Sequence, residues 1–561
     1  MIILGITSFE HDATAALLGD TGVIAAIEED KLARTPKIGG IPRLAMDFVL
    51  HRGGARPADL AAVAVATCPR RAWLREEKFR MELLLSRPAS SYQTGAIGRV
   101  YRSYNHLRLL RNQIGPHVPL LQFEHHLCHA ASAYYPSPFD RALVLTLDEA
   151  GDMLSGMIAL GEGDELRPIR NIRFPDSFGW FYTRVTELLG LRPHLDEGKT
   201  QWLGRTGSAD LVGEFRKFFQ ADKLGVPQLN RRFFGNGIAG QWSFSVQARR
   251  QLGISGAEPP QEAAQRTNIA RSAQVFLEEA VVALAEQYRK KTGATSLAVA
   301  GGVFQNVLLV RAMENRAGFE KVFVQPAAGN AGTSLGAAYL AQKKLTHKSG
   351  RRPLVSIDWG PDFDSGELKA VLDNSKIIYR YMNVESDLFA EIVRLLNAGK
   401  IVAWCHGRLE FGLRALGNRS LLASPFSPYV IENLNRYIKH REDFHPFALS
   451  VPAEKASELV DFTANCRFLA SVGELRAGVK GLDDFTFLGR QVRLHVVERE
   501  ANLRFWNLLE AFGASAPAPV LINASFNLFG EPLVAEPRDA VRSFYCSGTD
   551  ALVMGNFLVT K

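Results

Sequence analysis

The chain has 561 residues, of which 47% are hydrophobic and 22% are charged. This composition is typical of a folded protein rather than a disordered one, and the length is too great for one hydrophobic core, so we expect at least two domains. The formal net charge is +8, but the basic residues are spread along the chain. No nucleic-acid partner is therefore predicted, and the mild positive excess suits anionic substrates.

Five widely separated cysteines include no CxxC pair, which indicates neither a zinc ribbon nor a disulfide framework and fits a reducing cytoplasm. The first residues turn polar early and lack a basic leader. No apolar run approaches the roughly 20 residues of a membrane-spanning helix. We therefore expect a cytoplasmic protein with no membrane partner.

Two strand groups share one pattern. Residues 2–30 predict three strands joined by short turns, and residues 141–172 repeat this meander. An acidic residue follows the first strand of each copy, Asp12 in one and Asp148 in the other. A duplicated meander is typical of actin-like phosphotransfer folds, although two ordinary hairpins can give the same pattern by coincidence.

Between the meanders, residues 120–135 predict a short strand and then a helix that carries three histidines. His125 and His129 lie on one helical face, where two imidazoles can bind one metal. Asp148 completes a set of two histidines and one carboxylate, which suits Fe(II), Mn(II) or Zn(II). The alternative is a structural role, which is usual for a lone helical histidine; His126 points elsewhere and can support the ligands from behind.

Further along, residues 295–313 and 321–344 each predict a strand, a turn of small residues and a helix. Such turns let backbone N–H groups approach an anion, although strand-to-helix turns use glycine routinely. Residues 268–293 predict a long helix that ends at a glycine. Residues 70–111 predict mostly helix with a strongly basic surface, which we interpret as a solvated face first and a partner surface second.

A polar stretch at residues 343–355 predicts a domain boundary. We expect an N-terminal domain over residues 1–345 and a C-terminal α/β domain over residues 355–561, both of common size.

Basic residues cluster in the C-terminal domain. Residues 408–419 carry three arginines among glycines, and residues 439–445 carry a lysine, an arginine and histidines. Buried cations are costly unless an anion compensates them, and a triphosphate or acyl phosphate would do so. The alternative is a set of surface salt bridges with Glu410, Glu432 and Glu442, which the interleaved apolar residues disfavour.

Together these motifs resemble the O-carbamoyltransferase family of the nodulation and cephamycin type, over essentially the whole chain. The motifs that carry the resemblance are HDATAALL, EHHLCHAASAYYPSPF, LDEAGD, DEGKTQWLGRTG, AGGVFQN, PAAGNAGTSLGAA, EFGLRALGNRSLL, KHREDFHPFA and INASFNLFGEP. The resemblance implies an α/β chain with a duplicated actin-like (ASKHA) N-terminal domain. It also implies a C-terminal domain similar to threonylcarbamoyl-adenylate synthases (YrdC-like).

The resemblance implies a two-step reaction. The C-terminal domain would form carbamoyl-adenylate from carbamoyl phosphate and ATP with Mg. The N-terminal domain would then transfer the carbamoyl group to a hydroxyl of a small-molecule acceptor, in specialised metabolism such as antibiotic biosynthesis. One divalent metal, Fe(II) first with Mn or Zn as alternatives, would bind to His125, His129 and Asp148. A homodimer is compatible with this interpretation.

The other site residues implied by the family motifs fall into two groups. His11, Asp12 and Lys37 match the transfer site, where His11 is a candidate general base for the acceptor hydroxyl. Fixed cations at the second group would stabilise charge on the phosphates. The residues of this substrate- and nucleotide-binding group are Arg414, Lys439, His445, Arg493, Ser525, Gly301, Gly302 and Asn330.

Several positions depart from the family pattern. Asn330 replaces an aspartate and offers a neutral carbonyl oxygen, which would lower metal affinity. His445 replaces an arginine and is a weaker phosphate ligand near neutral pH. The remaining departures are His495 for glutamine, Ala524 for threonine, Glu149 for glycine, and the bulky Gln201 and Trp202. They keep two alternatives open: a homologue that uses another acyl donor or a different condensation, and a non-catalytic nucleotide-binding partner of another protein.

Overall fold

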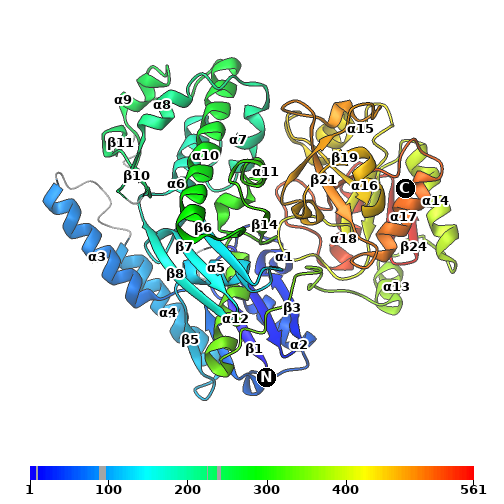
Figure 1. Cartoon of the computed structure of the whole chain (residues 1–561). Helices are drawn as coiled ribbons and strands as arrows, with labels where there is room; N and C mark the ends of the chain where they lie inside the picture. Colours follow the sequence, from blue (N-terminus) through cyan, green and yellow to red (C-terminus); the bar gives the residue numbers. More distant parts are fainter. Residues whose placement is uncertain (8–10, 87–95, 224, 237–241) are drawn as a thin grey trace. The chain divides into compact units, whose positions relative to one another are not determined.

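The computed structural model describes residues 1–7, 11–86, 96–223, 225–236 and 242–561 (Figure 1). The chain forms two compact units. Unit 1 comprises Met1–Ile24 and Gly39–Pro353, and unit 2 comprises Ala25–Ile38 and Leu354–Lys561. Across the described ranges, no helix is both long enough and apolar enough to cross a membrane.

Unit 1 is built on two five-stranded sheets with one topology, β3-β2-β1-β4-β5 and β8-β7-β6-β13-β14. In the first sheet β1 pairs antiparallel with β2 and parallel with β4, and in the second β6 pairs antiparallel with β7 and parallel with β13. The duplicated meander predicted from the sequence is therefore confirmed. The strands are β1 (Ile3–Ile6), β2 (Thr14–Gly19), β3 (Gly22–Glu28), β4 (Ala62–Val65), β5 (Leu120–Gln122), β6 (Arg141–Gly151), β7 (Leu154–Glu162), β8 (Glu165–Arg173), β13 (Ser296–Ala300) and β14 (Lys321–Val324).

Two helices link the duplicated sheets of unit 1. Helix α12 (Ala331–Thr346) packs on β1, β2 and β4, while helix α5 (His125–Tyr134) packs on β6, β7 and β13. The two helices cross so closely that a Cβ atom at Gly336 would lie 1.8 Å from the carbonyl oxygen of Cys128. Glycine at this crossing therefore allows the contact between the two halves.

The remaining elements of unit 1 surround these sheets. The predicted long helix is α10 (Ala263–Thr292), which ends at Gly293 with a φ of 64°, as the glycine stop predicted. The predicted basic helical segment forms α3 (Pro69–Ser86) and α4 (Ala96–Ile114), and its residues 87–95 lie outside the described residues. The other helices and short strands are α2 (Arg43–Arg52), α6 (Phe178–Leu188), α7 (Glu197–Leu203), α8 (Val212–Lys217), α9 (Val246–Gln251), α11 (Val307–Arg316), β9 (Phe219–Ala221), β10 (Pro227–Leu229), β11 (Phe234–Asn236) and β12 (Trp242–Phe244).

Unit 2 is an α/β unit around one ten-stranded sheet of order β15-β24-β23-β16-β17-β22-β18-β21-β20-β19. Buried apolar side chains form two core clusters in this unit. The strands are β15 (Arg380–Tyr381), β16 (Val402–Cys405), β17 (Arg419–Ala423), β18 (Ala448–Pro452), β19 (Val460–Asp461), β20 (Val472–Leu475), β21 (Gln491–Val497), β22 (Leu521–Ser525), β23 (Ala551–Met554) and β24 (Phe557–Thr560). The helices are α1 (Glu29–Ala33), α13 (Ser365–Asn374), α14 (Glu385–Asn397), α15 (Val430–Glu432), α16 (Ala453–Leu459), α17 (Leu503–Gly513) and α18 (Pro537–Tyr545).

The segment Ala25–Ile38, which includes the end of β3, is grouped with unit 2, whereas the sequence analysis placed it within the N-terminal domain. Its Lys31 ammonium group is buried and donates hydrogen bonds of 2.8 Å to the carbonyl oxygens of Glu410 and Gly412. The same ammonium group lies 2.8 Å from the carboxylate of Glu28. Removing one partner of a buried pair is costly, and the hydrogen bonds of Lys31 join the segment to the rest of unit 2. The signal is long-range, so no local pattern in the sequence indicates it.

Candidate functional site

Helix α5 carries the three histidines, and acidic side chains fix its first turn. Glu124 caps the helix, because its carboxylate accepts hydrogen bonds of 3.2 Å from the N–H groups of His126 and Leu127. The carboxylate of Asp152 accepts the N–H of His125 at 3.0 Å. Carboxylates are favourable at a helix N-terminus, where N–H groups are unpaired and the helix dipole is positive. These carboxylates thus fix the first turn of α5 and, with it, the positions of the histidines.

His125, His129 and Asp148 form a cluster of two buried histidines and one half-buried carboxylate, in which one ligand atom from each lies within 4.8 Å of the others. The Nε2 atoms of His129 and His125 lie 3.0 Å and 3.8 Å from Oδ2 of Asp148. Among the described residues, nothing forms a hydrogen bond with either ring nitrogen of His125 or with Nδ1 of His129. Buried polar atoms usually have partners, so these nitrogens beside a carboxylate fit a bound divalent metal better than apolar packing.

Asp148 lies at an irregularity of strand β6. The pairing with β7 is regular up to Leu147 and then shifts register before Gly151. The sequence analysis placed Asp148 just past the strand; the strand instead continues through this bulge, which re-aims the side chain. The carboxylate oxygen Oδ1 accepts the N–H of Glu149 at 2.7 Å. Gly151 leaves room for the cluster, because a Cβ atom there would lie 2.1 Å from the ring of His125.

The three ligand groups influence one another's pKa values. Burial lowers the pKa of His129. Burial also acts to lower the pKa of His125, but the Asp148 carboxylate outweighs it and the net shift is upward. Burial alone would raise the pKa of Asp148, whereas its contacts with both histidines hold that pKa well below its usual range. Asp148 is therefore an anion near neutral pH, which is the state that a metal requires.

His126 has a different role from its neighbours. Its Nε2 lies 3.1 Å from the carbonyl oxygen of Leu154, and its Nδ1 lies 3.0 Å from the hydroxyl of Thr146. A carbonyl can only accept, so Nε2 carries the proton and Nδ1 accepts the Thr146 hydroxyl. Burial holds the pKa of His126 well below its usual value. The ring is therefore neutral and structural. It points away from the cluster of His125, His129 and Asp148, which is called the metal-type cluster below.

A second group of predicted residues comes together at the start of helix α12. Nδ1 of His11 lies 3.0 Å from the carboxylate of Asp12. The side-chain amide nitrogen of Asn330 lies 3.2 Å and 3.3 Å from the two ring nitrogens of His11. The side chain of His11 is 47% exposed, so a substrate hydroxyl can reach it. The fold thus joins two predicted motifs that are 319 residues apart.

Gly301 and Gly302 lie beside the metal-type cluster. A Cβ atom at Gly301, where φ is +103°, would lie 2.1 Å from the carbonyl oxygen of Leu147. A Cβ atom at Gly302 would lie 2.9 Å from Oδ1 of Asp148. The glycine pair therefore allows this turn to approach β6 closely. Its predicted contact with substrate or nucleotide stays a prediction.

Lys37, the third residue predicted for the transfer site, is exposed and belongs to unit 2. His11 and Asp12 belong to unit 1. The contacts within unit 1 therefore do not include Lys37, and its role in transfer stays a prediction.

Unit 2 holds four cationic side chains that affect one another, Arg414, Lys439, Arg441 and Arg493. Burial is the first cause of a strongly lowered pKa at Lys439, and repulsion from Arg441 is the second. Burial likewise lowers the pKa of Arg493 well below its usual value, with further repulsion from Arg414 and Arg441. Lys439 is buried and the three arginines are half-buried, and grouping cations away from water in this way is unfavourable without anionic groups nearby. The cluster therefore suits a phosphate-rich ligand.

The ammonium group of Lys439 is held at the end of strand β22. It donates hydrogen bonds to the hydroxyl of Ser525 at 3.1 Å and to Oδ1 of Asn527 at 2.6 Å. It also donates to the carbonyl oxygens of both residues. Two predicted binding residues, Lys439 and Ser525, are thus neighbours. The sequence analysis missed Asn527; its place two residues after Ser525 in the same motif was the available signal.

Most hydrogen bonds of the arginine-rich loop at residues 408–419 join its side chains to nearby backbone groups. Arg419 is 1% exposed and donates to four backbone carbonyl oxygens, and Arg408 donates to two others. The carboxylate of Glu410 accepts three backbone N–H groups of the loop. Two of the three arginines grouped as anion binders are therefore structural, and only Arg414 joins the cation cluster. Glu410 also does not form the surface salt bridge that the alternative interpretation required.

The two histidines that depart from the family pattern are both held by neighbours. His445 lies 3.7 Å from the carboxylate of Glu442, and its ring stacks on Phe444 at 5.1 Å. His495 is buried, its Nδ1 lies 2.9 Å from the hydroxyl of Ser450, and burial lowers its pKa to about 3. His495 is therefore neutral and offers no charge to a phosphate.

Comparison with known proteins covers both units. The protein-family model called carbamoyltransferase N-terminus matches residues 2–339. The family model called carbamoyltransferase C-terminus matches residues 393–561. Nodulation protein NolNO of Sinorhizobium fredii is 31% identical over 99% of this chain and 79% of its own length. The 3'-hydroxymethylcephem-O-carbamoyltransferase of Amycolatopsis lactamdurans is 32% identical over 42% of this chain and 44% of its own length. Likeness to solved structures is weak: component A of (R)-2-hydroxyglutaryl-CoA dehydratase from Acidaminococcus fermentans, 14% identical, covers 61% of this chain and 98% of its own with a TM-score of 0.34.

Proposed function

Because the chain belongs to the carbamoyltransferase family, we propose that this transferase is an ATP-dependent O-carbamoyltransferase that modifies a hydroxyl of a small molecule. The observation that carries the proposal is the grouping of the buried Lys439 with the half-buried Arg414, Arg441 and Arg493, which suits an anion of high charge. ATP and carbamoyl phosphate supply such an anion. The named cephem O-carbamoyltransferases among the relatives support the choice of a hydroxyl acceptor.

The activation step is assigned to unit 2, which we take to be the YrdC-like domain. Water cleaves carbamoyl phosphate to carbamate and inorganic phosphate. A carbamate oxygen then attacks the α-phosphorus of ATP, the bond between the α- and β-phosphates breaks, and pyrophosphate leaves. Arg414, Lys439 and Arg493 stabilise the charge that develops on the phosphate oxygens. The product, carbamoyl-adenylate, has AMP as a good leaving group.

The transfer step is assigned to unit 1, which we take to be the actin-like (ASKHA) domain. The acceptor hydroxyl attacks the carbamoyl carbon, its proton passes to a base, and the bond from carbon to the AMP oxygen breaks. His11 is the base, since Asp12 orients its ring and Asn330 contacts it. A divalent metal held by His125, His129 and Asp148 would supply Lewis-acid polarisation when bound. The acidic caps of α5 keep these ligands in place.

Isotope exchange tests the activation step directly. Labelled pyrophosphate is incubated with the metal-loaded protein, ATP and carbamoyl phosphate, and label in ATP is measured with carbamoyl phosphate present and absent. We expect exchange only when carbamoyl phosphate is present. We expect the His125→Ala/His129→Ala variant to keep this exchange, because its substitutions lie in unit 1. Folded, metal-loaded protein without exchange would remove the proposed activation.

A second candidate function, with the same fold but another acyl donor, is favoured by His495. This neutral ring stands where the family has a glutamine and is fixed by Ser450 and Asn523. A donor site altered there can select a different acid. Mass spectrometry of reactions with ATP and a panel of small carboxylates tests this candidate, which requires an acyl-adenylate other than carbamoyl-adenylate.

A further inference from the structure

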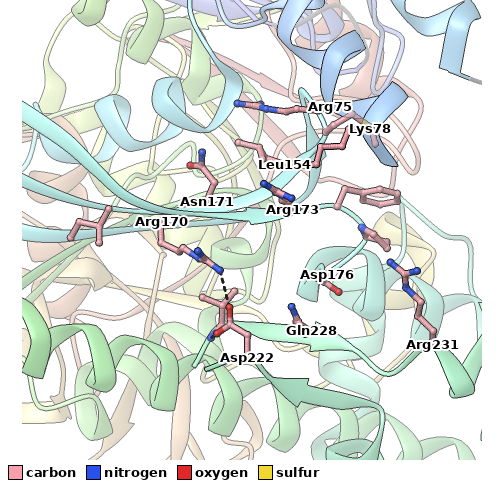
Figure 2. Close-up of a pocket in the computed structure, with 15 residues that line it drawn as sticks. Arg75, Lys78, Leu154, Arg170, Asn171, Arg173, Asp176, Asp222, Gln228 and Arg231 are labelled. Atoms are coloured by element: carbon pink, nitrogen blue, oxygen red, sulfur yellow. Dashed lines mark hydrogen bonds and ion pairs between the residues drawn. The ribbon is translucent and has the colours of Figure 1, made fainter. Parts of the chain in front are cut away.

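Unit 1 contains a cavity of about 630 Å³ that is separate from the residues assigned above (Figure 2). Its lining comes from helix α3, from strands β7 and β8, and from the segments around β9 and β10. A cavity of this size is large enough for a small metabolite. None of the known family motifs falls on it, so nothing described so far gives it an occupant.

The lining carries a clear positive excess. It contains five cationic side chains, Arg75, Lys78, Arg170, Arg173 and Arg231, and two carboxyl groups, Asp176 and Asp222, which leaves three positive charges in excess. One carboxylate is already used, since Asp222 lies 2.8 Å from Arg170 (Figure 2), and one cation is too, since Arg75 lies 3.7 Å from the carboxylate of Glu124 behind the lining. Burial raises the pKa of the other, Asp176, to about 6. The cavity therefore favours an anionic ligand.

Part of this positive charge is not compensated. Within the described ranges, Lys78, Arg173 and Arg231 have no carboxylate within ion-pair distance. In the cavity wall, Nε of Arg170 is buried with no hydrogen-bond partner among the described residues. Guanidinium groups bind carboxylate and phosphate oxygens through paired, charge-assisted hydrogen bonds. Two or more arginines facing one cavity thus fit a ligand with at least two negative charges.

Residues that line the cavity also contact the segments that hold the histidine cluster. Leu154, which lines the cavity, accepts the Nε2–H of His126 at 3.1 Å through its carbonyl oxygen. Arg75 donates to the carbonyl oxygen of Asp152 at 2.8 Å, and the carboxylate of Asp152 accepts the N–H of His125. A ligand bound here would therefore touch the same hairpin that holds the metal-type cluster.

We propose that this cavity binds a small molecule with two or more negative charges, as phosphate or carboxylate groups, and that this is the anionic part of the hydroxyl acceptor. The role as acceptor rests on the proposed transfer reaction, whereas the anion binding does not. The cations of α3, β8 and the β10 segment select the acceptor by its charge. The basic surface predicted from the sequence for residues 70–111 thus contributes Arg75 and Lys78 to a binding cavity.

Isothermal titration calorimetry on the full chain tests the binding, with inorganic phosphate and citrate as probes. The titrations use the Arg493→Gln background, because the cation cluster of unit 2 also attracts phosphate. Adding Arg173→Ala and Arg231→Ala should weaken binding at least about tenfold, as loss of two charge-assisted contacts predicts. Adding Arg216→Ala instead should leave binding unchanged, because that exposed arginine pairs with Glu279 at 2.8 Å outside the cavity.

The outcomes separate binding from transfer. Tighter binding of phosphate indicates a phosphate ester, and tighter binding of citrate indicates a polycarboxylate. Binding should persist in the His125→Ala/His129→Ala variant, so a failed transfer reaction leaves this result intact. If neither probe binds, or if the double substitution binds both probes like its parent, the cavity does not bind anions. The single substitutions Arg173→Gln and Arg231→Gln keep the test usable if the double variant does not fold.

Discussion

Lys31 and Glu410 are 379 residues apart in sequence, yet the Lys31 ammonium group donates a 2.8 Å hydrogen bond to the Glu410 carbonyl oxygen inside unit 2. The same ammonium group neutralises the buried carboxylate of Glu28. Glu410 in turn holds the loop that presents Arg414 to the cation cluster, through three backbone N–H groups. A short N-terminal segment therefore supports the predicted phosphate site.

Replacing Lys31 tests this support. Lys31→Met leaves the Glu28 carboxylate buried without its cation, and we expect a loss of about 3–5 kcal/mol in the stability of unit 2. Hydrogen–deuterium exchange of the β16 and β17 amides in the intact chain reports that loss. Lys369→Met, which removes an exposed pair with Asp373, should leave the exchange of these amides nearly unchanged. Equal exchange in the two variants would contradict the buried contact.

Metal content tests the histidine cluster. After purification with Fe(II) and dialysis, we expect about one first-row divalent metal per chain, as for an open three-ligand site. His125→Ala/His129→Ala should remove it, because two of three ligand groups are lost. His51→Ala, a surface histidine of α2, serves as the control. The assignment is wrong if elemental analysis finds the same metal content in the wild type and in the double variant.

Lys439 is predicted to be needed for activation. Lys439→Met removes the charge that Ser525 and Asn527 position, and we expect carbamoyl-phosphate-dependent pyrophosphate exchange to fall by about 10²–10³-fold. Lys400→Met, which removes an exposed pair with Asp550 at 3.0 Å, should leave the exchange rate unchanged. An active Lys439→Met protein would place the phosphate site elsewhere.

The pH dependence of stability should carry a signature of Asp358. Burial, with Glu410 as a further cause, raises the pKa of Asp358 to about 7. The folded state then binds this proton more tightly than the unfolded state, whose carboxyl has a pKa of about 4. Below about pH 4 the carboxyl group is protonated in both states and does not destabilise the fold. As the pH rises from about 4 through 7, only the folded state keeps the proton, so the free energy of unfolding falls.

Comparison with a neutral side chain isolates this effect. Asp358→Asn keeps an uncharged group at the site, so the variant should gain stability relative to the wild type as the pH rises from 5 to 8, because the wild type must then bury a carboxylate. Thermal melting across this range measures the difference. Parallel melting curves at every pH would show that Asp358 titrates in the folded chain much as it does in the unfolded chain.

Gly301 should tolerate no side chain. Gly301→Ala places a Cβ atom 2.1 Å from the Leu147 carbonyl oxygen at a φ of +103°, and we expect a loss of about 2–4 kcal/mol in stability. Gly198→Ala, in helix α7 with nothing within 4 Å of the added atom, should be neutral or stabilising. Chemical denaturation of unit 1 compares the two. Similar stability in both variants would mean that the turn can move away from β6.

The sequence predicted the parts of the fold that local patterns encode. The duplicated meanders, the histidine helix α5 and the long helix α10 follow from alternation, helical spacing and a glycine stop. The pairing of β1 with β4 and of β6 with β13 lies beyond such patterns, because those partners are distant in sequence.

For the candidate site, the sequence indicated which residues to expect there, but not which groups their side chains would contact. The cluster of His125, His129 and Asp148 was predicted from spacing, and the structure places the three side chains together. Arg419 looked like a phosphate ligand, yet it binds backbone carbonyls, because side-chain direction is decided by tertiary packing. Asn527 was overlooked although it lies in the same motif as Ser525, because its contact with Lys439 joins residues that are 88 positions apart.

The passage of residues Ala25–Ile38 into unit 2 limits how this protein can be dissected. A fragment that starts at Leu354 would lack Lys31. It would therefore also lack the buried hydrogen bond from the Lys31 ammonium group to the Glu410 carbonyl oxygen. A peptide covering residues 25–38, added in trans or fused ahead of residue 354, should rescue such a fragment. The two halves of this enzyme are thus interleaved along the gene and cannot be separated by one cut.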